Sequence, residues 1–358
     1  MKDKKIYKNP DITVWELTLK CNLKCLHCGS SAGFKRTNEL TTKQALQLCH
    51  DLSDLGFKGI ALMGGELFLR KDWEVISKEI KDLGIILSII TNGYFSPDKI
   101  IRQLNSIEPE CVMVGLDGSS AEIQDKIRNV DGAFNKIMNF IHAAKEANLP
   151  IGIITTVHKM NFADLPNIKN IIVNKQIGWQ IQEATPIGRF PKNLLLSDEE
   201  YYTLGLFIYS MQKKYKTKEI PIVGVHNFGF FSRAIPNLSS YPKWEGCYAG
   251  KTVLGIQSNG NVKGCLALSD KFIEGNVLNR KIQEIWNDLD SFSYNRNFKI
   301  ENLGENCRNC KYGKKCKGGC LTRSSSITGI PHNDPNCYYR IEKNIDNLID
   351  IEQENSNL

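Results

Sequence analysis

Residues 21–28 of the chain read CNLKCLHC, which places three cysteines within one short stretch, at Cys21, Cys25 and Cys28. We interpret them as metal ligands rather than disulfide partners, because the chain starts MKDKKIYKNPD and lacks the apolar segment of an export signal. A [4Fe–4S] cluster has four irons, so three thiolates leave one iron open. Zinc would need a fourth ligand, and the local candidate, His27, is too close in sequence to the cysteines for tetrahedral binding. The stretch therefore predicts an iron–sulfur site with one open position.

Six short apolar runs, rich in Ile and Val, predict buried β-strands. They span 13–20, 59–64, 85–93, 111–118, 151–157 and 179–184. Helical patterns separate or follow them, at about 41–55, 73–83, 97–105, 133–148, 164–175 and 198–214. This alternation predicts a parallel sheet with right-handed crossovers. Because six units are fewer than the eight of a closed barrel, we expect an α/β fold of the partial (β/α)6 type, a TIM-like barrel with an open side.

A polar or glycine-rich segment follows each of the first four predicted strands. CNLKCLHC directly follows the first, and the others are MGGE (63–66), TNG (91–93) and LDG (116–118). Any one of them could be a mere turn. The carboxyl ends of parallel strands, however, meet at one rim. We therefore expect the four segments to form a catalytic mouth around the cysteines.

A second group of cysteines lies near the end of the chain. Its seven members are Cys247, Cys265, Cys307, Cys310, Cys316, Cys320 and Cys337. Their irregular spacing suits two iron–sulfur clusters better than one zinc ribbon. Within this part, VLGIQSNGNVKGCL (253–266) predicts a hairpin around Asn259-Gly260, and a helix is expected near 281–289. Cys49 and Cys111 stand alone and are interpreted as small core residues.

The order CxxxCxxC after the first strand of a six-unit barrel resembles the signature of the radical S-adenosylmethionine (SAM) superfamily. The resemblance implies that Cys21, Cys25 and Cys28 bind three irons of a [4Fe–4S] cluster, and that the amino and carboxylate groups of SAM bind the fourth. In that family an electron from the cluster cleaves SAM to a 5′-deoxyadenosyl radical, which abstracts hydrogen from the substrate. The resemblance thus assigns the open iron to a cosubstrate.

Several segments of the mouth resemble SAM contacts of the same family. GGE (64–66) matches the family's GGEP segment, which binds the SAM amino group, with Leu67 in place of the proline. His27 occupies a site where a ring packs against adenine. PIGR (186–189), after the sixth strand, resembles a further adenine contact. No catalytic residue is assigned beyond the cluster ligands.

LDGSSAEIQDKIR (116–128) resembles the stretch whose arginine, here Arg128, reaches the SAM carboxylate. The serine that usually precedes LDG is Gly115 in this chain, which puts one SAM contact in doubt. The implied cofactor-binding residues are His27, Gly64, Gly65, Glu66, Asn92, Asp117, Arg128, Pro186 and Gly188.

The C-terminal cysteines resemble the SPASM domain, an extension of radical SAM enzymes that mature peptides and proteins. The resemblance implies two auxiliary clusters, and thus three [4Fe–4S] clusters in all. One ligand set is complete and consists of Cys307, Cys310, Cys316 and Cys337. The other has three members, Cys247, Cys265 and Cys320, because YAGKTVLG (248–255) contains no further cysteine. Its fourth ligand is left open between a side chain such as His226 or Asp270, a water molecule and the substrate.

These features divide the chain into five segments. They are an N-terminal segment (1–12), a radical SAM core (13–215), a linker or substrate-facing loop (216–245), a SPASM domain (246–342) and a polar tail (343–358).

We expect an oxidoreductase that matures a peptide or small-protein side chain, for example by a thioether or C–C crosslink in a ribosomally made peptide. A sulfatase-maturing enzyme is disfavoured, because Leu266 stands where that branch has an acidic residue. We expect no separate leader-binding module before the barrel, and therefore a discrete recognition protein or direct docking of the peptide. The reductant is expected to be a flavodoxin or ferredoxin. A small-molecule substrate, such as a haem precursor or sugar, is the alternative.

Composition sets outer limits on the function. With 41% hydrophobic and 24% charged residues among 358, the chain is ordinary for a soluble globular protein. No apolar run approaches a membrane span, so we expect a cytoplasmic protein without membrane contact. The charge of +7 is mild, although lysines such as Lys311, Lys314, Lys315 and Lys317 could meet an acidic peptide or balance thiolate charge. An iron–sulfur electron carrier would have no use for the segments of the mouth. A nucleic-acid-binding protein would show interleaved basic and aromatic residues on one face.

Overall fold

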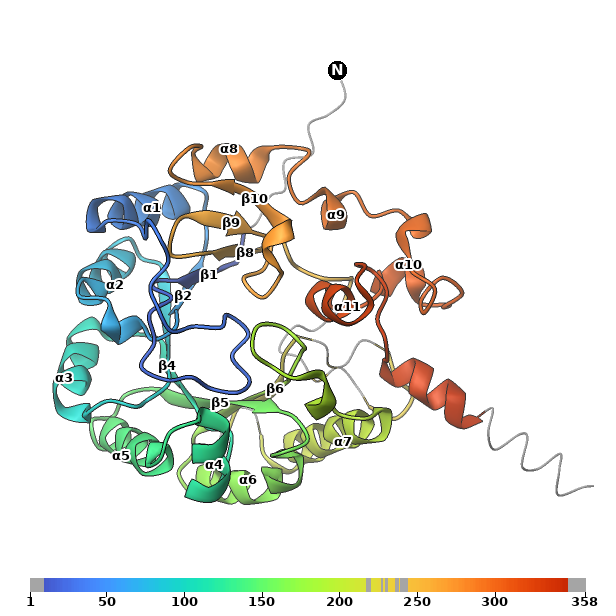
Figure 1. Cartoon of the computed structure of the whole chain (residues 1–358), viewed down its shortest axis with the longest axis horizontal. Helices are drawn as coiled ribbons and strands as arrows, with labels where there is room; N and C mark the ends of the chain where they lie inside the picture. The colour runs from blue at the N-terminus through green and yellow to red at the C-terminus, as the bar shows by residue number, and fades with distance from the viewer. Residues whose placement is uncertain are drawn as a thin grey trace, which may run out of the picture.

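The computed structural model describes residues 10–216, 220–226, 228, 231–235, 238 and 244–346. Within these residues, ten strands form one sheet in the order β10-β9-β8-β1-β2-β3-β4-β5-β6-β7. Helices surround the barrel strands on their outer side (Figure 1). The predicted α/β fold, a parallel sheet in the form of a partial barrel, is confirmed.

The six predicted strands are all present. They are β1 (Ile12–Glu16), β2 (Gly59–Met63), β3 (Ile86–Thr91), β4 (Cys111–Gly115), β5 (Ile151–Val157) and β6 (Gly178–Glu183). Each of the first five pairs in parallel with the next strand along the chain. Alternate side chains such as Trp15, Leu62 and Val114 are completely buried. The parallel register brings the carboxyl ends of all six strands to the same rim.

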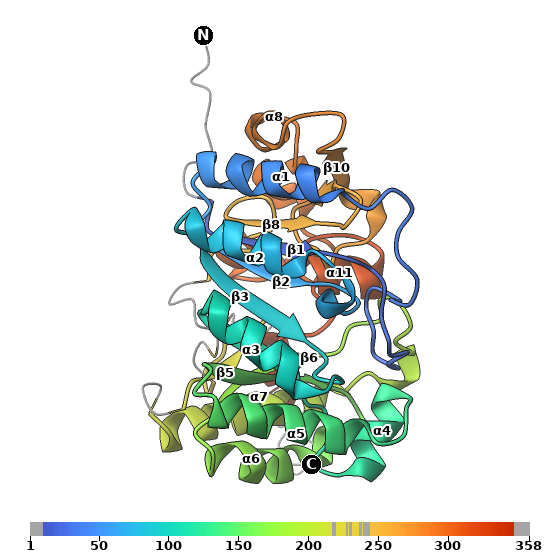
Figure 2. The ribbon, with the colours of Figure 1, turned by 90° about the vertical axis from the view of Figure 1, so that its left-hand side faces the viewer.

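The predicted outer helices are also present. They are α1 (Thr42–Asp54), α2 (Trp73–Asp82), α3 (Pro97–Ile107), α5 (Ala133–Glu146), α6 (Leu165–Val173) and α7 (Asp198–Lys214). Figure 2 shows α1, α2, α3 and α5 side by side in front of the strands. Each buries an apolar face, which on α3 includes Ile100, Leu104 and Ile107. A capping box opens α1, because the Thr41 N–H donates to Gln44 Oε1 at 2.8 Å and the Gln44 N–H donates to Thr41 Oγ1.

The sequence patterns miss two elements of the barrel. The short helix α4 (Ala121–Arg128) lies between β4 and α5. Strand β7 (Ile222–Gly224) lies in the segment that was expected to be irregular, and it pairs in parallel with β6. Residues 1–9, parts of 217–243 and residues 347–358 of the expected N-terminal segment, linker and tail lie outside the described residues.

The C-terminal part belongs to the same sheet as the barrel. Strand β8 (Val253–Ile256) pairs in parallel with β1 and antiparallel with β9 (Asn261–Lys263), which confirms the hairpin. Gly260 lies in its turn with φ +88°. Strand β10 (Ile273–Asn276) was not predicted and pairs with β9. The helices of this part are α8 (Ile282–Asn287), α9 (Ser293–Arg296), α10 (Gly313–Cys316), α11 (Leu321–Thr328) and the helical residues 338–346.

Among the described residues, no helix has the length and apolar character that a membrane crossing requires.

Candidate active site

The three cysteines of CNLKCLHC lie on the long loop that connects β1 to α1. In Figure 1 this dark blue loop crosses the middle of the barrel. Strand β1 ends at Glu16, so the expectation that Cys21 directly follows the strand is wrong. Leu17 still donates its N–H to the Met63 carbonyl at 2.7 Å, but the next residues leave the sheet, because the Leu19 N–H donates to the Glu39 carboxylate at 2.9 Å.

The cysteine loop surrounds its sulfur atoms with backbone donors. The Leu23 N–H donates to Cys21 Sγ at 3.4 Å, and the Ala32 N–H donates to Cys28 Sγ at 3.3 Å. Such donors favour the thiolate form. Burial works against it, since it raises the pKa of Cys21 to about 11 and also raises the pKa of Cys25. A bound metal would resolve this conflict, because a coordinating thiol is deprotonated.

The GGE segment after β2 packs directly against the chain that leads to Cys21. A Cβ atom on Gly64 would lie 2.4 Å from the Thr18 carbonyl oxygen. A Cβ atom on Gly65 would lie 2.5 Å from the carbonyl oxygens of Leu19 and Lys20. The Gly65 N–H donates to the Thr18 carbonyl at 2.7 Å. These two glycines therefore have a packing role in the mouth, besides the SAM contact that the resemblance implies.

Glu66 and Asn92 join the GGE and TNG segments to the first cysteine. The buried Glu66 carboxylate accepts hydrogen bonds from Thr91 Oγ1 at 3.0 Å and from the Asn92 N–H at 2.8 Å. Burial raises the pKa of Glu66 to about 7. Asn92 Nδ2 donates to Asn22 Oδ1 at 2.8 Å and lies 3.9 Å from Cys21 Sγ. Segments from three strands thus meet at one side of the cysteine loop.

The PIGR segment after β6 also contacts the cysteine loop. Gly188 has φ +60°, and a Cβ atom there would lie 2.3 Å from the Cys28 carbonyl oxygen. Pro186 is half-buried beside it. The Arg189 guanidinium donates to two carbonyls of the loop, that of Cys25 at 3.1 Å and that of Ala32 at 2.7 Å. Sequence reasoning missed Arg189, because an arginine in a loop is usually solvated.

Other predicted residues form a buried polar cluster beside the cysteines. Asp117 pairs with Arg128 Nη2 at 2.5 Å and lies 3.4 Å from His27 Nε2. Burial alone would raise the pKa of Asp117, but the neighbouring Arg128 guanidinium holds it below its usual range. Arg128 Nη1 lies 3.9 Å from Cys25 Sγ. A Cβ atom on Gly115 would lie 2.2 Å from Arg128 Nη2, so the glycine in place of the usual serine leaves room for the guanidinium.

His158, which follows β5, also belongs to this cluster and was missed by sequence reasoning. Its side chain is completely buried, and its ring centroid lies 6.1 Å from that of His27. Nδ1 accepts the Met160 N–H at 3.3 Å, so the proton of the neutral ring is on Nε2. Burial lowers the pKa of His158, and it lowers that of His27 to about 4. A lone histidine after a strand gives no sequence signal, and only the fold brings it to the mouth.

The polar cluster fits a polar ligand. Three of its buried atoms have no hydrogen-bond partner among the described residues, namely His27 Nδ1, Arg128 Nε and His158 Nε2. Unpaired buried polar groups are rare and often indicate a missing ligand. SAM carries a carboxylate, an amino group, ribose hydroxyls and adenine nitrogens, which match these groups. The residues present therefore fit SAM bound beside a cluster held by the adjacent cysteines.

The seven C-terminal cysteines lie in two neighbourhoods. Burial and the thiols of Cys247 and Cys265 raise the pKa of Cys320, which places these three together. In the other neighbourhood, burial, Asp334 and neighbouring thiols raise the pKa values of Cys307, Cys316 and Cys337. The thiol of Cys310 also raises the pKa of Cys307, which places Cys310 in the same neighbourhood.

The cysteines are all free thiols. No three Cys, His, Asp or Glu side chains of the described residues converge as ligands of a single metal ion.

Asp270 and His226 were suggested as a fourth ligand for the set of Cys247, Cys265 and Cys320. The Asp270 carboxylate accepts hydrogen bonds from Gln257 Nε2 at 2.7 Å and from Lys263 Nζ at 3.3 Å. His226 is exposed after β7, with φ +71°.

Asn295 holds the segment of Cys247 in place, because its Nδ2 donates to the Cys247 carbonyl at 2.8 Å.

A buried ion-pair network connects the barrel to the C-terminal part. Arg323, on α11, donates to Glu183 Oε2 at 2.9 Å, at the end of β6, and to Asp334 Oδ1 at 2.7 Å. All three side chains are buried, and the guanidinium lies 4.8 Å from the Tyr201 ring centroid. Because Arg323 is close in sequence to Cys320, the network fixes the C-terminal cysteines relative to the mouth.

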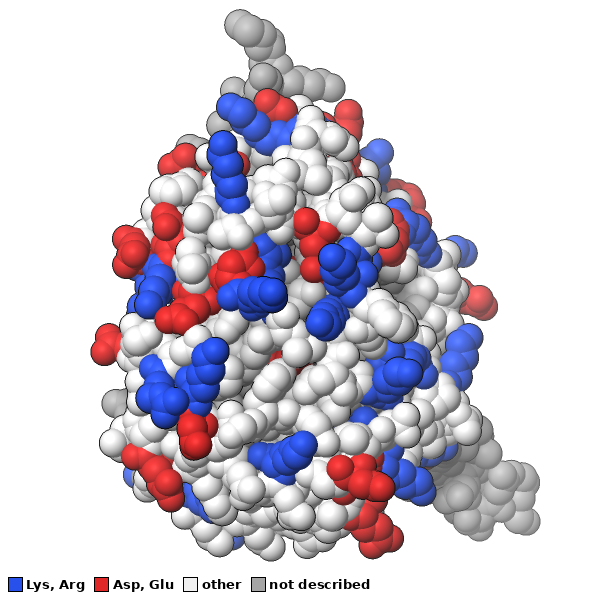
Figure 3. Space-filling model, turned by 60° about the vertical axis from the view of Figure 1, so that its left-hand side comes forward, with Lys and Arg blue, Asp and Glu red and all other residues white. Residues whose placement is uncertain are grey.

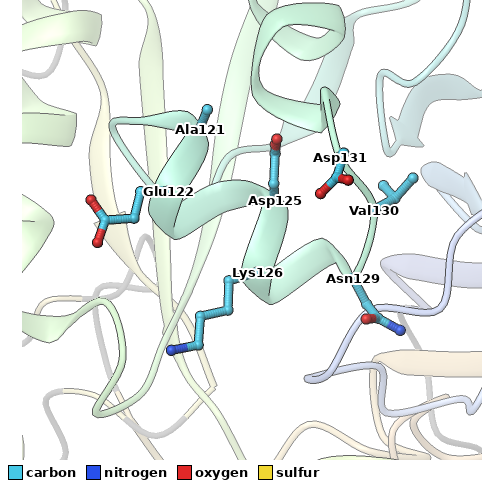
Figure 4. A pocket seen from close by; sticks show the side chains of 7 residues that line it. All are labelled: Ala121, Glu122, Asp125, Lys126, Asn129, Val130 and Asp131. Carbon is cyan, nitrogen blue, oxygen red and sulfur yellow. The ribbon is translucent and has the colours of Figure 1, made fainter.

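Two surface hollows lie outside the polar cluster. The larger, about 690 Å³, is lined by α4 and the turn that follows it. Its side chains are spread along the helix and do not converge on one point (Figure 4). The smaller, about 540 Å³, is lined by residues 35–39. On the face drawn in Figure 3, basic and acidic side chains are intermingled. Neither the hollows nor the charge on this face indicates a second active site.

Comparison with known proteins identifies two domains in the chain. The family model described as the radical SAM superfamily matches residues 15–172. The model described as SPASM, an iron–sulfur cluster-binding domain, matches residues 247–311.

Curated relatives have different named activities. The AdoMet-dependent heme synthase of Methanosarcina barkeri is 28% identical and is aligned over 92% of this chain and 97% of the relative. The mycofactocin maturase MftC of Mycobacterium tuberculosis is 27% identical and is aligned over 92% of this chain and 83% of the relative. Among solved structures, Streptococcus suis SuiB bound to precursor peptide SuiA has a TM-score of 0.75 at 16% identity, and covers 92% of this chain and 76% of SuiB. At that identity the likeness concerns the fold.

Proposed function

Because this chain is a radical SAM enzyme that carries a SPASM domain, we propose that it oxidatively modifies a side chain of a peptide or small protein. A thioether or C–C crosslink is the expected class of product. Cys21, Cys25 and Cys28 would hold the SAM-binding cluster. The Cys307 and Cys247 neighbourhoods would hold two auxiliary clusters, which makes three in all.

The observation that carries the proposal is the grouping of ten cysteines into sets of three, three and four, with the first set at the barrel mouth. A [4Fe–4S] cluster held by Cys21, Cys25 and Cys28 would supply the single electron needed for the reductive cleavage of SAM. Two unpaired members of the polar cluster, Arg128 Nε and His158 Nε2, are available as donors to SAM.

The electrostatics of the polar cluster suit a cationic cosubstrate. Burial lowers the pKa values of His27 and His158, which favours their neutral forms, so the two rings would add no positive charge to a site that receives a cationic cosubstrate. The positive charge of Arg128 is balanced by Asp117. The buried walls of the mouth would exclude water from a reactive radical.

The proposed substrate class is inferred from the relatives, which also support a second candidate substrate. A maturase among the curated relatives and the fold of SuiB, which was solved with a precursor peptide, support a peptide. The heme synthase relative, aligned over 97% of its own length, favours a haem precursor as the second candidate. A separate leader-recognition protein and a flavodoxin or ferredoxin reductant belong to the same proposal.

The test supplies both substrate classes to the reconstituted, oxygen-protected enzyme with SAM and a reductant. One arm contains synthetic peptides encoded beside the gene, and the other contains an iron porphyrin precursor of haem. We expect 5′-deoxyadenosine formation with the loss of two hydrogen atoms from a peptide, detected by mass spectrometry. The Cys111→Ala variant, which changes a cysteine outside the three sets, should keep this activity. Conversion of the porphyrin alone favours the second candidate, and no change in any substrate contradicts both.

A further inference from the structure

An exposed basic segment surrounds part of the four-cysteine set. Residues 305–317 read ENCRNCKYGKKCK, with five basic side chains and one acidic side chain. Lys311, Lys314 and Lys315 are exposed and lie between Cys310 and Lys317. In the described part of the chain, no ion pair joins these three lysines to a carboxylate. Because the three side chains are exposed, their ammonium groups face solvent.

Aromatic rings lie beneath the lysines. Tyr312 stacks on Phe231 with 4.3 Å between ring centroids and meets the edge of Tyr339 at 4.9 Å. Lys311 Nζ lies 5.1 Å from the centroids of both tyrosines, and Lys315 Nζ lies 5.6 Å from that of Phe231. Contacts of this kind order the lysine stems while the ammonium groups remain in water. We call this surface the basic–aromatic patch, and it consists of Phe231, Lys311, Tyr312, Lys314, Lys315 and Tyr339.

The basic–aromatic patch lies next to the four-cysteine set and away from the barrel mouth. Tyr312 lies between Cys310 and Cys316 in sequence and is the N-cap of α10. Figure 1 shows α10 at the outer edge of the molecule, with α11 between it and the barrel. A substrate side chain has to reach the mouth, whereas an electron carrier needs only a close approach to a cluster.

We propose that the basic–aromatic patch docks an acidic one-electron carrier protein. The inference rests on the proposed function, because it needs an iron–sulfur cluster at the four-cysteine set. In the direction tested, one electron leaves the carrier, which is oxidised by one electron, and the cluster is reduced by one electron. No covalent bond changes. A small aromatic surface with exposed lysines beside it suits the weak, electrostatically steered encounters of redox partners.

The test uses the holoenzyme, with a purified acidic flavodoxin as the probe. The patch variant is Lys311→Glu/Lys314→Glu/Lys315→Glu. Its matched control is Lys43→Glu/Lys99→Glu/Lys145→Glu, which makes the same charge change at exposed lysines of α1, α3 and α5. We measure flavodoxin binding by calorimetry, and cluster reduction by reduced flavodoxin or by dithionite in stopped flow.

We expect the patch variant to be reduced by flavodoxin at least about tenfold more slowly at low salt, with correspondingly weaker binding. Its reduction by dithionite should equal that of the wild type, and the control should be unchanged with both reductants. The deficit should vanish at about 1 M salt, where surface charges are screened.

Equal flavodoxin rates for the patch variant and the wild type at low salt would overturn the proposal. It is also wrong if the patch variant loses peptide modification with dithionite as the sole reductant, because the patch then serves the substrate. Iron content and the rate of reduction by dithionite establish that each variant contains its clusters. If a Glu variant lacks clusters, the corresponding Lys→Gln triple variant takes its place, and the expected order of rates is the same. A wild type with no cluster at the four cysteines would contradict the proposed function instead.

Discussion

At the scale of single residues, the cysteine loop is held by contacts that leave no room for a side chain. Gly188 combines a left-handed backbone, φ +60°, with a close approach to the Cys28 and Gly29 carbonyl oxygens. A side chain there would be strained and would also push the loop away from its place.

We predict that Gly188→Ala lowers the free energy of unfolding by about 1–3 kcal/mol and reduces iron at the first cysteine set. The matched control is Gly56→Ala, at a glycine with φ +82° where an added Cβ would meet no atom within 4 Å. It should cost only the backbone strain, about 1 kcal/mol, and keep the iron. Denaturant titration and iron analysis measure both effects, and equal results for the two variants would contradict the packing role.

The sequence predicts some residues of the site and not others, for a physical reason. Cysteines at fixed spacing are informative because few other functions need several thiols on one loop. His158 and Arg189 carry no such signal, since each is a single polar residue in a loop. Their importance depends on burial and on partners distant in sequence, which only the fold determines.

At the scale of elements, the sequence predicts the long, apolar strands and helices but misses α4 and β7. Helix α4 is short and polar, and it is stabilised by tertiary contacts, such as the Leu26 N–H donating to the Ile127 carbonyl at 2.9 Å. Strand β7 has three residues and depends on its pairing with β6. Local patterns cannot report stability that comes from such distant partners.

The joint between β6 and α11 gives a prediction at this scale. Replacing Arg323 with Met removes the guanidinium that pairs with the buried carboxylates of Glu183 and Asp334. We expect the free energy of unfolding to fall by about 3–5 kcal/mol. The control, Arg280→Met, removes the half-exposed pair with Asp288 and should cost about 1 kcal/mol or less.

Denaturant titration of both variants checks this prediction. Adding Glu183→Gln and Asp334→Asn to Arg323→Met should recover part of the loss, because the buried negative charges that Arg323 balanced are then gone. The account of the joint fails if Arg323→Met is no less stable than Arg280→Met.

At the scale of the whole molecule, barrel and C-terminal part share one sheet through the pairing of β8 with β1. That pairing was not predicted, because a parallel contact between strands so far apart in sequence leaves no local pattern. Together with the Arg323 network, it ties the C-terminal cysteine sets to the barrel mouth. The barrel mouth and the C-terminal cysteine sets are thus connected through one sheet and one buried ion-pair network.

The central claim is that the cysteines of the first loop bind the cluster that cleaves SAM. Iron content and 5′-deoxyadenosine formation of the Cys21→Ala/Cys25→Ala/Cys28→Ala variant test it most directly. We predict about twelve irons in the reconstituted wild type, about eight in the variant, and no 5′-deoxyadenosine from the variant. A variant that still forms 5′-deoxyadenosine, or a wild type with zinc at this loop, would contradict the claim.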